Sequence, residues 1–245
     1  MKYPFFISLC ILVWSCSKPR NDDCITSMGE PTSSKRTVAS DIYEIYVEVR
    51  IQLVLIQDST KAGQLEIEAP AGIIDQITSL VEGPRLILRN NNTCNFVRSF
   101  DYEVVVRLYI KSISLLHAES IAEITTEGDI HIDDLRIFNY ALATSTLNLT
   151  GGQVYVQSNN SAQTILKGTI ATLKGSIEEI SDLDARNLMC KEVLLDSHTP
   201  LECYINASEG IYVNLYNSGN IFYTQEPNEY KLVGKTTSTG QLLPL

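Results

Sequence analysis

The chain has 245 residues and a formal net charge of −10, with 29 acidic residues against 19 basic ones. This length is enough for one large all-β domain, or for two small domains, with a sizeable core. The acidic balance excludes the class of proteins that bind nucleic acid through a basic surface. Because the acidic residues are scattered along the chain, we interpret them as a solvated surface that favours solubility.

The first residues have the pattern of a signal peptide. Lys2 precedes an apolar run over residues 4–14, which is too short to span a bilayer. Ser15 and Cys16 follow at once, and a small residue before a cysteine resembles the lipobox of bacterial lipoproteins. That resemblance implies a signal peptide over residues 1–15, lipidation of Cys16 and a membrane anchor. The alternative is an ordinary secretory signal in which the cysteine is incidental.

Residues 17–36 are polar, include two prolines and show no periodicity, so we expect residues 16–36 to form a lipidated tether. Asn21, Asp22 and Asp23 resemble the acidic export signal of surface lipoproteins in Bacteroidetes. We therefore predict a protein of the cell envelope that is lipid-anchored to the outer membrane and exposed at the cell surface. A location that faces the periplasm is the alternative.

Removal of the signal peptide and lipidation of Cys16 leave four cysteines. They are Cys24, Cys94, Cys190 and Cys203. Four cysteines allow three pairings, and the sequence does not choose among them. No Cys-x-x-Cys spacing occurs, so a structural zinc site is not expected. Neighbouring strands could bring Cys190 and Cys203 together, but buried free thiols fit the pattern at least as well.

We interpret residues 37–111 as a cap that closes one end of the domain. Apolar residues alternate over residues 45–56, which predicts a long strand. A loop then leads to residues 65–67, a second strand with which the first would form a hairpin.

A short helix is predicted next in this cap. Its apolar residues recur at the spacing that places them on one side of a helix. They are Ile73, Ile74, Ile77, Leu80 and Val81. Gly83 and Pro84 would end the helix, and strands over residues 86–88 and 103–110 follow.

The remaining part, residues 112–245, contains short apolar-alternating segments with polar turns between them. Each segment has the period of two that a strand requires. The segments are residues 121–124, 129–132, 147–149, 154–156, 177–180, 192–195, 211–215 and 221–223. Such short units bury little apolar surface alone, whereas coils stacked on one another share a continuous core. We therefore predict a parallel β-solenoid, with an antiparallel sandwich or barrel as the alternative.

The order of these features resembles a known family, the putative adhesins with a head GIN domain that are abundant among Bacteroidetes lipoproteins. The resembling segments cover nearly the whole mature domain. They are residues 36–38, 47–57, 65–69, 81–83, 86–88, 104–110, 113–121 and 217–223, with Pro227 beyond. The chain departs from the family in its turns, because repeated Gly-Ser-Gly turns are mostly missing and Glu226 replaces the glycine usual before the late proline.

This resemblance implies an all-β fold over residues 37–245, a right-handed parallel β-helix or solenoid. With the pattern of residues 37–111, we expect it to carry an N-terminal cap of strands and a short helix. The resemblance also implies a cell-surface or adhesive role, and it brings no catalytic residues with it.

Candidate catalytic and metal-binding groups are sparse in the sequence. His131 has acidic neighbours, but the alternation of its strand makes it an exposed residue. Asp182 and Asp184 would share one strand face, where two carboxylates can bind calcium or act as an acid and base. No basic residue in the local sequence completes such a site, and no hydrolase, phosphate-loop or dinucleotide motif occurs. We predict no catalytic residue, metal or cofactor, and the alternative is a polysaccharide-active β-helix enzyme.

Tyr155 and Tyr212 occupy the outward positions of their strands and are the predicted binding residues. Tyrosine supplies a large amphipathic contact surface at low entropic cost, although it also covers neighbouring side chains in strands. We therefore predict a surface adhesin or binding module whose partner is a glycan or protein on a host or neighbouring cell. The alternative is a structural module of the envelope that has no ligand and joins an assembly by edge or end stacking.

Overall fold

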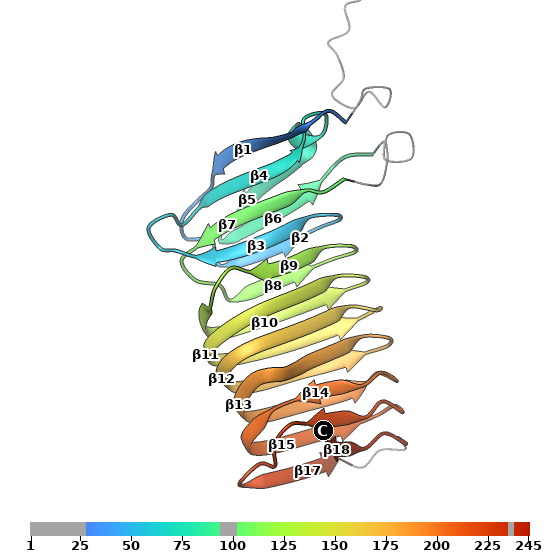
Figure 1. Ribbon diagram of the computed structural model, residues 1–245. Coiled ribbons are helices and arrows are strands. Elements are labelled where there is room, and N and C mark those ends of the chain that lie inside the picture. The colour runs from blue at the N-terminus through green and yellow to red at the C-terminus, as the bar shows by residue number, and fades with distance from the viewer. Residues whose placement is uncertain (1–27, 94–101, 235–237) are drawn as a thin grey trace, which may run out of the picture.

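The structure is a computed structural model that describes residues 28–93, 102–234 and 238–245. Within these residues the strands form one hydrogen-bonded sheet that winds into a β-solenoid of about 6 turns. The coils stack along one long axis, with the N-terminal elements at one end and the C-terminal elements at the other (Figure 1). The elements are β1 (Pro31–Thr37), β2 (Glu44–Val47), β3 (Gln52–Gln57), β4 (Gln64–Pro70), the 3₁₀ turn η1 (Ile74–Gln76), β5 (Ile77–Glu82), β6 (Arg85–Asn90), β7 (Val105–Ile110), β8 (Leu115–Ala118), β9 (Glu123–Thr126), β10 (Ile130–Tyr140), β11 (Thr144–Asn159), β12 (Gln163–Glu178), β13 (Asp182–His198), β14 (Cys203–Ile205), β15 (Ala207–Leu215), β16 (Ile221–Tyr223), β17 (Tyr230–Gly234) and β18 (Leu242–Pro244).

Each coil contributes one stretch to each of two broad faces of the solenoid. Face A consists of β5, β6, β2, β8, the second halves of β10 to β13, β15 and β17. Face B consists of β1, β4, β7, β3, β9, the first halves of β11 to β13, β14, β16 and β18. Apolar side chains that point inward from both faces form one continuous core. The predicted solenoid is therefore confirmed.

The corner between the two faces requires glycine in β11. Gly151 has a φ of +117°, a conformation that L side chains rarely adopt. A Cβ on Gly151 or Gly152 would collide with the carbonyl oxygen of Ile132 or Asp133 in the preceding coil. These two glycines therefore allow β10 and β11 to stack closely at the corner.

The opposite edge carries a repeated turn from face A to face B. It spans residues 119–122, 140–143 and 178–181, and in each turn the N–H of the fourth residue donates to the C=O of the first. The third residue is an exposed Ile or Leu, and the fourth is a buried Ala or Ser. The second residue has a positive φ although it is not glycine: Ser120 (61°), Ala141 (59°) and Glu179 (54°). This recurring turn is a repeat that the irregular spacing of the glycines does not reveal.

One coil lies out of sequence order. β2 pairs with both β6 and β8, and β3 pairs with both β7 and β9. The coil formed by β2 and β3 is therefore inserted between two coils that come later in the chain. Figure 1 shows it as a blue coil between green ones. The part predicted as a cap thus contributes two coils of the stack as well as the end itself.

The predicted helix over residues 73–81 is wrong. Only one 3₁₀ turn, Ile74–Gln76, is helical, and β5 follows it directly. β5 forms an antiparallel hairpin with β6 around Gly83, which has a positive φ. Ile77 is buried while Leu80 is 49% exposed, so the strand pairing decides the structure and the helical spacing is incidental. The end is therefore capped by strands and a single tight turn.

Two further expectations for the N-terminal part are corrected. Residues 45–56 do not form one strand, because a turn at Arg50 with a φ of 57° divides them into β2 on face A and β3 on face B. The predicted hairpin does not form either, since β4 pairs antiparallel with β1 and β7. β1 begins at Pro31, so the last residues of the predicted tether, residues 31–36, belong to the sheet.

At the C-terminal end of the stack, β17 and β18 each have one unpaired edge among the described strands. β17 pairs on one side with β15, and Val233 lies opposite the buried Val213 but is itself 46% exposed. Lys231 lies opposite buried Ile211, at a position where the earlier coils place apolar residues. Its ammonium group donates to Tyr223 Oη at 3.0 Å and pairs with Glu226. A charge at an inward position of the last strand is a device that discourages edge-to-edge pairing.

Candidate functional site

Tyr155 and Tyr212 lie in one row on the outer surface of face A. Tyr155 pairs with Lys174 of β12, Lys174 with Leu194 of β13, and Leu194 with Tyr212 of β15. Tyr155 is half-buried and Tyr212 is 37% exposed. At about 4.8 Å per strand, the two rings stand roughly 14 Å apart along the stack. The structure therefore brings the two predicted residues onto one surface but leaves two strands between them.

An aromatic stack runs along face A toward the capped end. The ring of Tyr46 stacks on that of His117 at 4.8 Å with an interplanar angle of 16°, and His117 lies 5.2 Å from Tyr140. The guanidinium of Arg85 covers the free side of Tyr46 at 4.3 Å. Because these ring faces cover one another, this part of the stack holds neighbouring coils together and offers little surface to a ligand.

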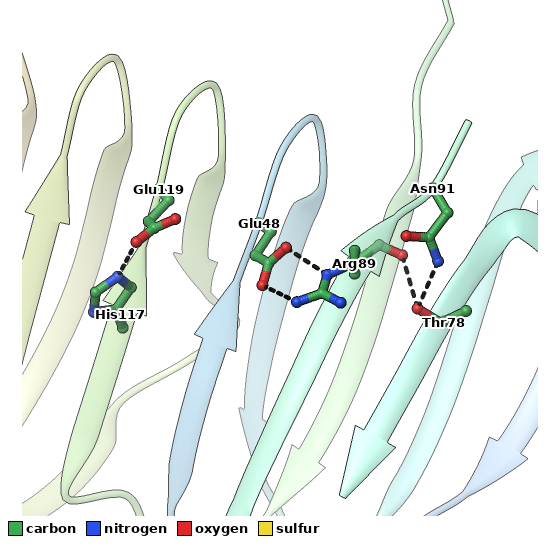
Figure 2. A network of polar contacts seen from close by, with 6 residues as sticks. All are labelled: Glu48, Thr78, Arg89, Asn91, His117 and Glu119. Atoms are coloured by element: carbon green, nitrogen blue, oxygen red, sulfur yellow. Dashed lines mark hydrogen bonds and ion pairs between the residues drawn. The ribbon is translucent and has the colours of Figure 1, made fainter. Parts of the chain in front are cut away.

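A row of polar contacts borders this stack. Arg89 of β6 donates from Nε and Nη2 to both carboxylate oxygens of Glu48, at 2.6 and 2.7 Å, and His117 of β8 contacts Glu119 at 2.8 Å (Figure 2). The hydrogen bond from Arg89 lowers the pKa of Glu48. On the far side of Arg89, Thr78 donates to its backbone oxygen at 3.4 Å. Thr78, Arg89 and Glu48 form one set of contacts and His117 and Glu119 form a second. Because these side chains are already paired with one another, we interpret both sets as structural.

The stack ends at a shallow depression between β10, β11 and β12. Its volume is about 440 Å³. Phe138 and Tyr155, whose rings are tilted at 58° and 6.3 Å apart, form its aromatic part. Arg136, Lys174 and Gln153 line it with donors, and Asp134 adds a carboxylate. A ring-shaped ligand with polar substituents fits this combination of an aromatic contact and surrounding hydrogen-bonding groups.

Two cations flank Tyr155 directly. Arg136 is its partner on β10 and Lys174 its partner on β12. Most basic side chains of the described residues form ion pairs, as Arg107 does with Glu127 at 3.0 Å. Within residues 28–93, 102–234 and 238–245, no ion pair involves Arg136 or Lys174, and the only polar contact of Lys174 is with Gln153 Oε1 at 3.3 Å. The depression therefore contains two cations that form no ion pair among the described residues, with the carboxylate of Asp134 as its one acidic lining residue.

The residues considered for catalysis are exposed or hydrogen-bonded to neighbouring side chains. His131 is exposed, as predicted. Asp184 accepts a hydrogen bond from Arg186 Nε at 2.8 Å, and Asp182 accepts one from Gln163 at 3.1 Å. Burial raises the pKa of Asp182. No group of three or more His, Cys, Asp or Glu side chains that could hold a metal ion occurs in the part of the chain that the structure describes.

Cys190 and Cys203 are both free and buried. They lie on β13 and β14, and burial raises the pKa of each thiol to about 12. They therefore do not form the disulfide that their strand positions allowed. Cys24, Cys94 and the predicted lipidation residue Cys16 lie outside the described residues. No helix among the described residues is long and apolar enough to cross a membrane.

Comparison with known protein families shows the family to which the chain belongs. A sequence model of the family described as putative auto-transporter adhesin, head GIN domain, matches residues 43–227. The chain belongs to this family. The match spans the out-of-order coil, the aromatic stack and the depression of face A. A comparison with functionally curated proteins finds no match.

Solved structures share the fold of this head GIN protein. A crystal structure of a putative adhesin from Bacteroides fragilis is 19% identical, with a TM-score of 0.79 over 88% of this chain and 97% of that one. A putative adhesin from Parabacteroides merdae is 14% identical, with a TM-score of 0.67 over 89% and 98%. A putative lipid binding protein from Parabacteroides distasonis is 15% identical, with a TM-score of 0.62 over 89% and 97%. At these identities the likeness concerns the fold.

The sequence analysis missed Arg136, Phe138 and Lys174. A usable signal existed, because Arg136 and Lys174 each lie one coil, or 19 residues, from Tyr155. Once a coil length is known, residues at that spacing become neighbours on one face. The irregular glycines gave no coil length, so the row was not recognised.

Proposed function

We propose that this head GIN protein is a non-catalytic adhesin of the bacterial cell envelope. In this proposal Cys16 is lipidated and anchors the chain to the outer membrane, and face A is exposed at the cell surface. The ligand is a glycan or protein on a host or neighbouring cell, and Tyr155 and Tyr212 contact it. The observation that carries the proposal is the depression at Tyr155 on a long outer face where the rings of Tyr46 and His117 cover each other, while the ring of Tyr212 remains exposed.

The position of the N-terminus supports the anchoring step. The described chain starts at Met28, whose C=O accepts a hydrogen bond from Gly72 N at 2.8 Å at the capped end of the solenoid. Eleven residues lie between Cys16 and Met28, and the twelve steps that join them span about 40 Å in a fully extended chain. A lipid on Cys16 would thus hold the capped end near the membrane and leave the depression on the stack beyond it.

The binding test uses glycan and matrix-protein arrays with the full chain. We expect saturable binding that is lost when Tyr155 and Tyr212 are both replaced by alanine. Tyr109→Ala is the matched control, because Tyr109 lies on β7 of face B, where Lys61 covers its ring. Near-identical circular dichroism would show that the double variant is folded. Equal loss of binding in the control would contradict the assignment to face A.

The anchoring test compares the wild type with Cys16→Ser in intact cells. We expect the wild type to remain with the outer-membrane fraction and to be cleaved by added protease. The variant should be released into the soluble fraction. A wild-type chain that stays protected until the outer membrane is broken would place face A in the periplasm and contradict surface exposure.

An envelope structural module without a ligand is the second candidate. The open C-terminal end favours it, because β17 and β18 each pair on one side only among the described strands. Lys231 opposes this candidate, since a charged inward residue hinders stacking of a further coil. A failure of binding on both arrays, together with co-purification of the chain in a larger envelope assembly, would favour this second function.

A further inference from the structure

We propose that the depression at Tyr155 binds an acidic glycan, through a sugar that carries a carboxylate or sulfate group. This inference rests on the proposed binding function of face A and names the chemical class of the ligand. The two cations on either side of Tyr155 carry the argument, and the aromatic and polar lining determines the kind of molecule.

The charges indicate an anionic group. Arg136 and Lys174 lie on the strands on either side of Tyr155, so their Cα atoms are about 10 Å apart, and both side chains are long enough to converge above the ring. Neither forms an ion pair within the described residues, although the chain carries 29 acidic residues. An anion above Tyr155 would receive charge-assisted hydrogen bonds from both, which are stronger than neutral ones.

The uncharged lining indicates a sugar. Sugar hydroxyl groups both donate and accept hydrogen bonds, and the depression supplies the amide of Gln153 and the carboxylate of Asp134 beside its two rings. Asp134 lies two residues before Arg136 on β10, on the same face, and it pairs with Gln153. It therefore borders one side of the depression. We therefore place the anionic group between Arg136 and Lys174, with hydroxyl groups toward Asp134.

The backbone disfavours the alternative of an acidic peptide. Peptides that bind β-proteins commonly add a strand to a free sheet edge and use main-chain hydrogen bonds. β11 is paired on both sides along the depression, with β10 and with β12. Its backbone groups are thus occupied by the ladder, and a ligand on this face has only side chains to contact.

The test measures binding of the full chain to two matched pairs of polymers. Dextran sulfate is compared with dextran, and polygalacturonate with its methyl ester, so that each pair differs only in the anionic group. We expect saturable binding to at least one anionic member and none to its neutral counterpart. The pair that responds distinguishes sulfate from carboxylate. Equal binding to both members of each pair would overturn the proposal.

Variants localise the binding. We expect Arg136→Gln combined with Lys174→Gln to weaken it at least about tenfold, because hydrogen bonds to charged groups are lost. Tyr155→Ala should weaken it similarly. The matched control is Lys111→Gln with Lys167→Gln, which removes the same charge from two exposed lysines that lie outside the depression. It should change affinity less than twofold.

Three further results would overturn the proposal. One is an equal loss of affinity in the control double variant, which would indicate non-specific attraction. Another is displacement of the anionic polymer by polyglutamate at equal concentration, which would indicate an acidic peptide site. The third is the absence of binding to either anionic polymer while the array ligand still depends on Tyr155 and Tyr212. In that last case the adhesin function stands and the acidic-glycan assignment fails.

Discussion

The side chain of Gln57 pairs with the backbone of His131 as a neighbouring strand would. Its Oε1 accepts from His131 N at 2.8 Å, and its Nε2 donates to His131 O at 3.1 Å. The same Nε2 donates to Lys111 O at 3.1 Å. β3 ends at Gln57 and β10 begins at Ile130, so this amide completes the hydrogen bonding where the ladder between the coils is interrupted.

Gln57→Leu should therefore lower the free energy of unfolding by about 1–2 kcal/mol. The substitution removes the side-chain hydrogen bonds of Gln57 to three backbone groups, which are Lys111 O, His131 O and His131 N. Urea denaturation followed by circular dichroism measures the change. Gln163→Leu is the control, since Gln163 is exposed and makes one side-chain hydrogen bond, to Asp182. A loss in Gln57→Leu no larger than in the control would contradict the role of the amide.

A buried polar cluster inside the stack should be equally sensitive. Thr164 Oγ1 accepts from Asn139 Nδ2 at 2.7 Å and lies 2.9 Å from Ser158 Oγ, and Ser145 donates to Asn139 Oδ1 at 2.8 Å. All four side chains are buried. Thr164→Val keeps the volume but removes the acceptor of Asn139 Nδ2 and the partner of Ser158 Oγ. We therefore expect a loss of about 1–3 kcal/mol.

The control for this cluster is Thr169→Val, an exposed position on the same strand, which should change stability by less than about 0.5 kcal/mol. Chemical denaturation of both variants gives the comparison. If Thr164→Val is as stable as the wild type, the cluster contributes nothing that an apolar contact does not replace.

The repeated turn predicts a stabilising substitution. Ala141 has a φ of 59°, which costs an L residue more than it costs glycine. Ala141→Gly should therefore raise the free energy of unfolding, by about 1 kcal/mol after the entropy of the unfolded glycine is subtracted. Ala143→Gly, two residues later, removes a buried methyl group without relieving a positive φ and should destabilise the protein. Opposite signs in thermal melts of the two variants are the expected result.

The buried thiols should resist alkylation in the folded protein. Burial raises the pKa of Cys190 and Cys203 to about 12, so at pH 8 almost none of either thiol is the reactive thiolate. Iodoacetamide at pH 8 should leave both unmodified in the native chain and modify both in urea. Mass spectrometry of the peptides that contain Cys190 and Cys203 measures the extent of alkylation of each cysteine separately. Rapid labelling of either one in the native chain would show that its coil opens readily.

Lys231 should prevent end-to-end association of the protein through β17. Lys231→Leu replaces an inward charge with an apolar side chain beside exposed Val233, so we expect concentration-dependent end-to-end association in sedimentation velocity. Lys191→Leu is the control, because Lys191 is exposed on a coil inside the stack. Equal association of both variants would point to general surface stickiness.

Much of the solenoid follows from local pattern. The period-two alternation correctly places Tyr155 and Tyr212 outward and Val154 and Val213 inward, because a strand position alone determines the face. The predicted segments of the second part overlap β9 to β16. Residues 121–124 begin in the turn before β9, residue 129 precedes β10, and residues 177–180 run from β12 into a turn. Local pattern did not give the length of the strands, since β11 to β13 continue around the corner through polar residues.

The rest depends on contacts between residues distant in sequence. The spacing of Ile73 and Ile77 fits one side of a helix as well as one face of a strand. The pairing of β5 with β6 decides between the two structures. The neighbours of Tyr155 in the depression depend on register, which the sequence does not reveal without a coil length. No local signal marks the insertion of β2 and β3 between later coils, because that order arises only when β8 and β9 dock.

The inserted coil has a consequence for the order of folding. Residues 44–57 remain unpaired on one side until residues 115–126 have followed them, so the N-terminal half cannot wind coil by coil as the chain emerges. From β10 onward each coil docks directly on its predecessor, and winding can proceed in chain order. We therefore expect two phases of folding, a closure that waits for β9 and then the addition of later coils in chain order. In a chain that has folded only as far as β7, the edges of β2 and β3 that later pair with β8 and β9 remain exposed.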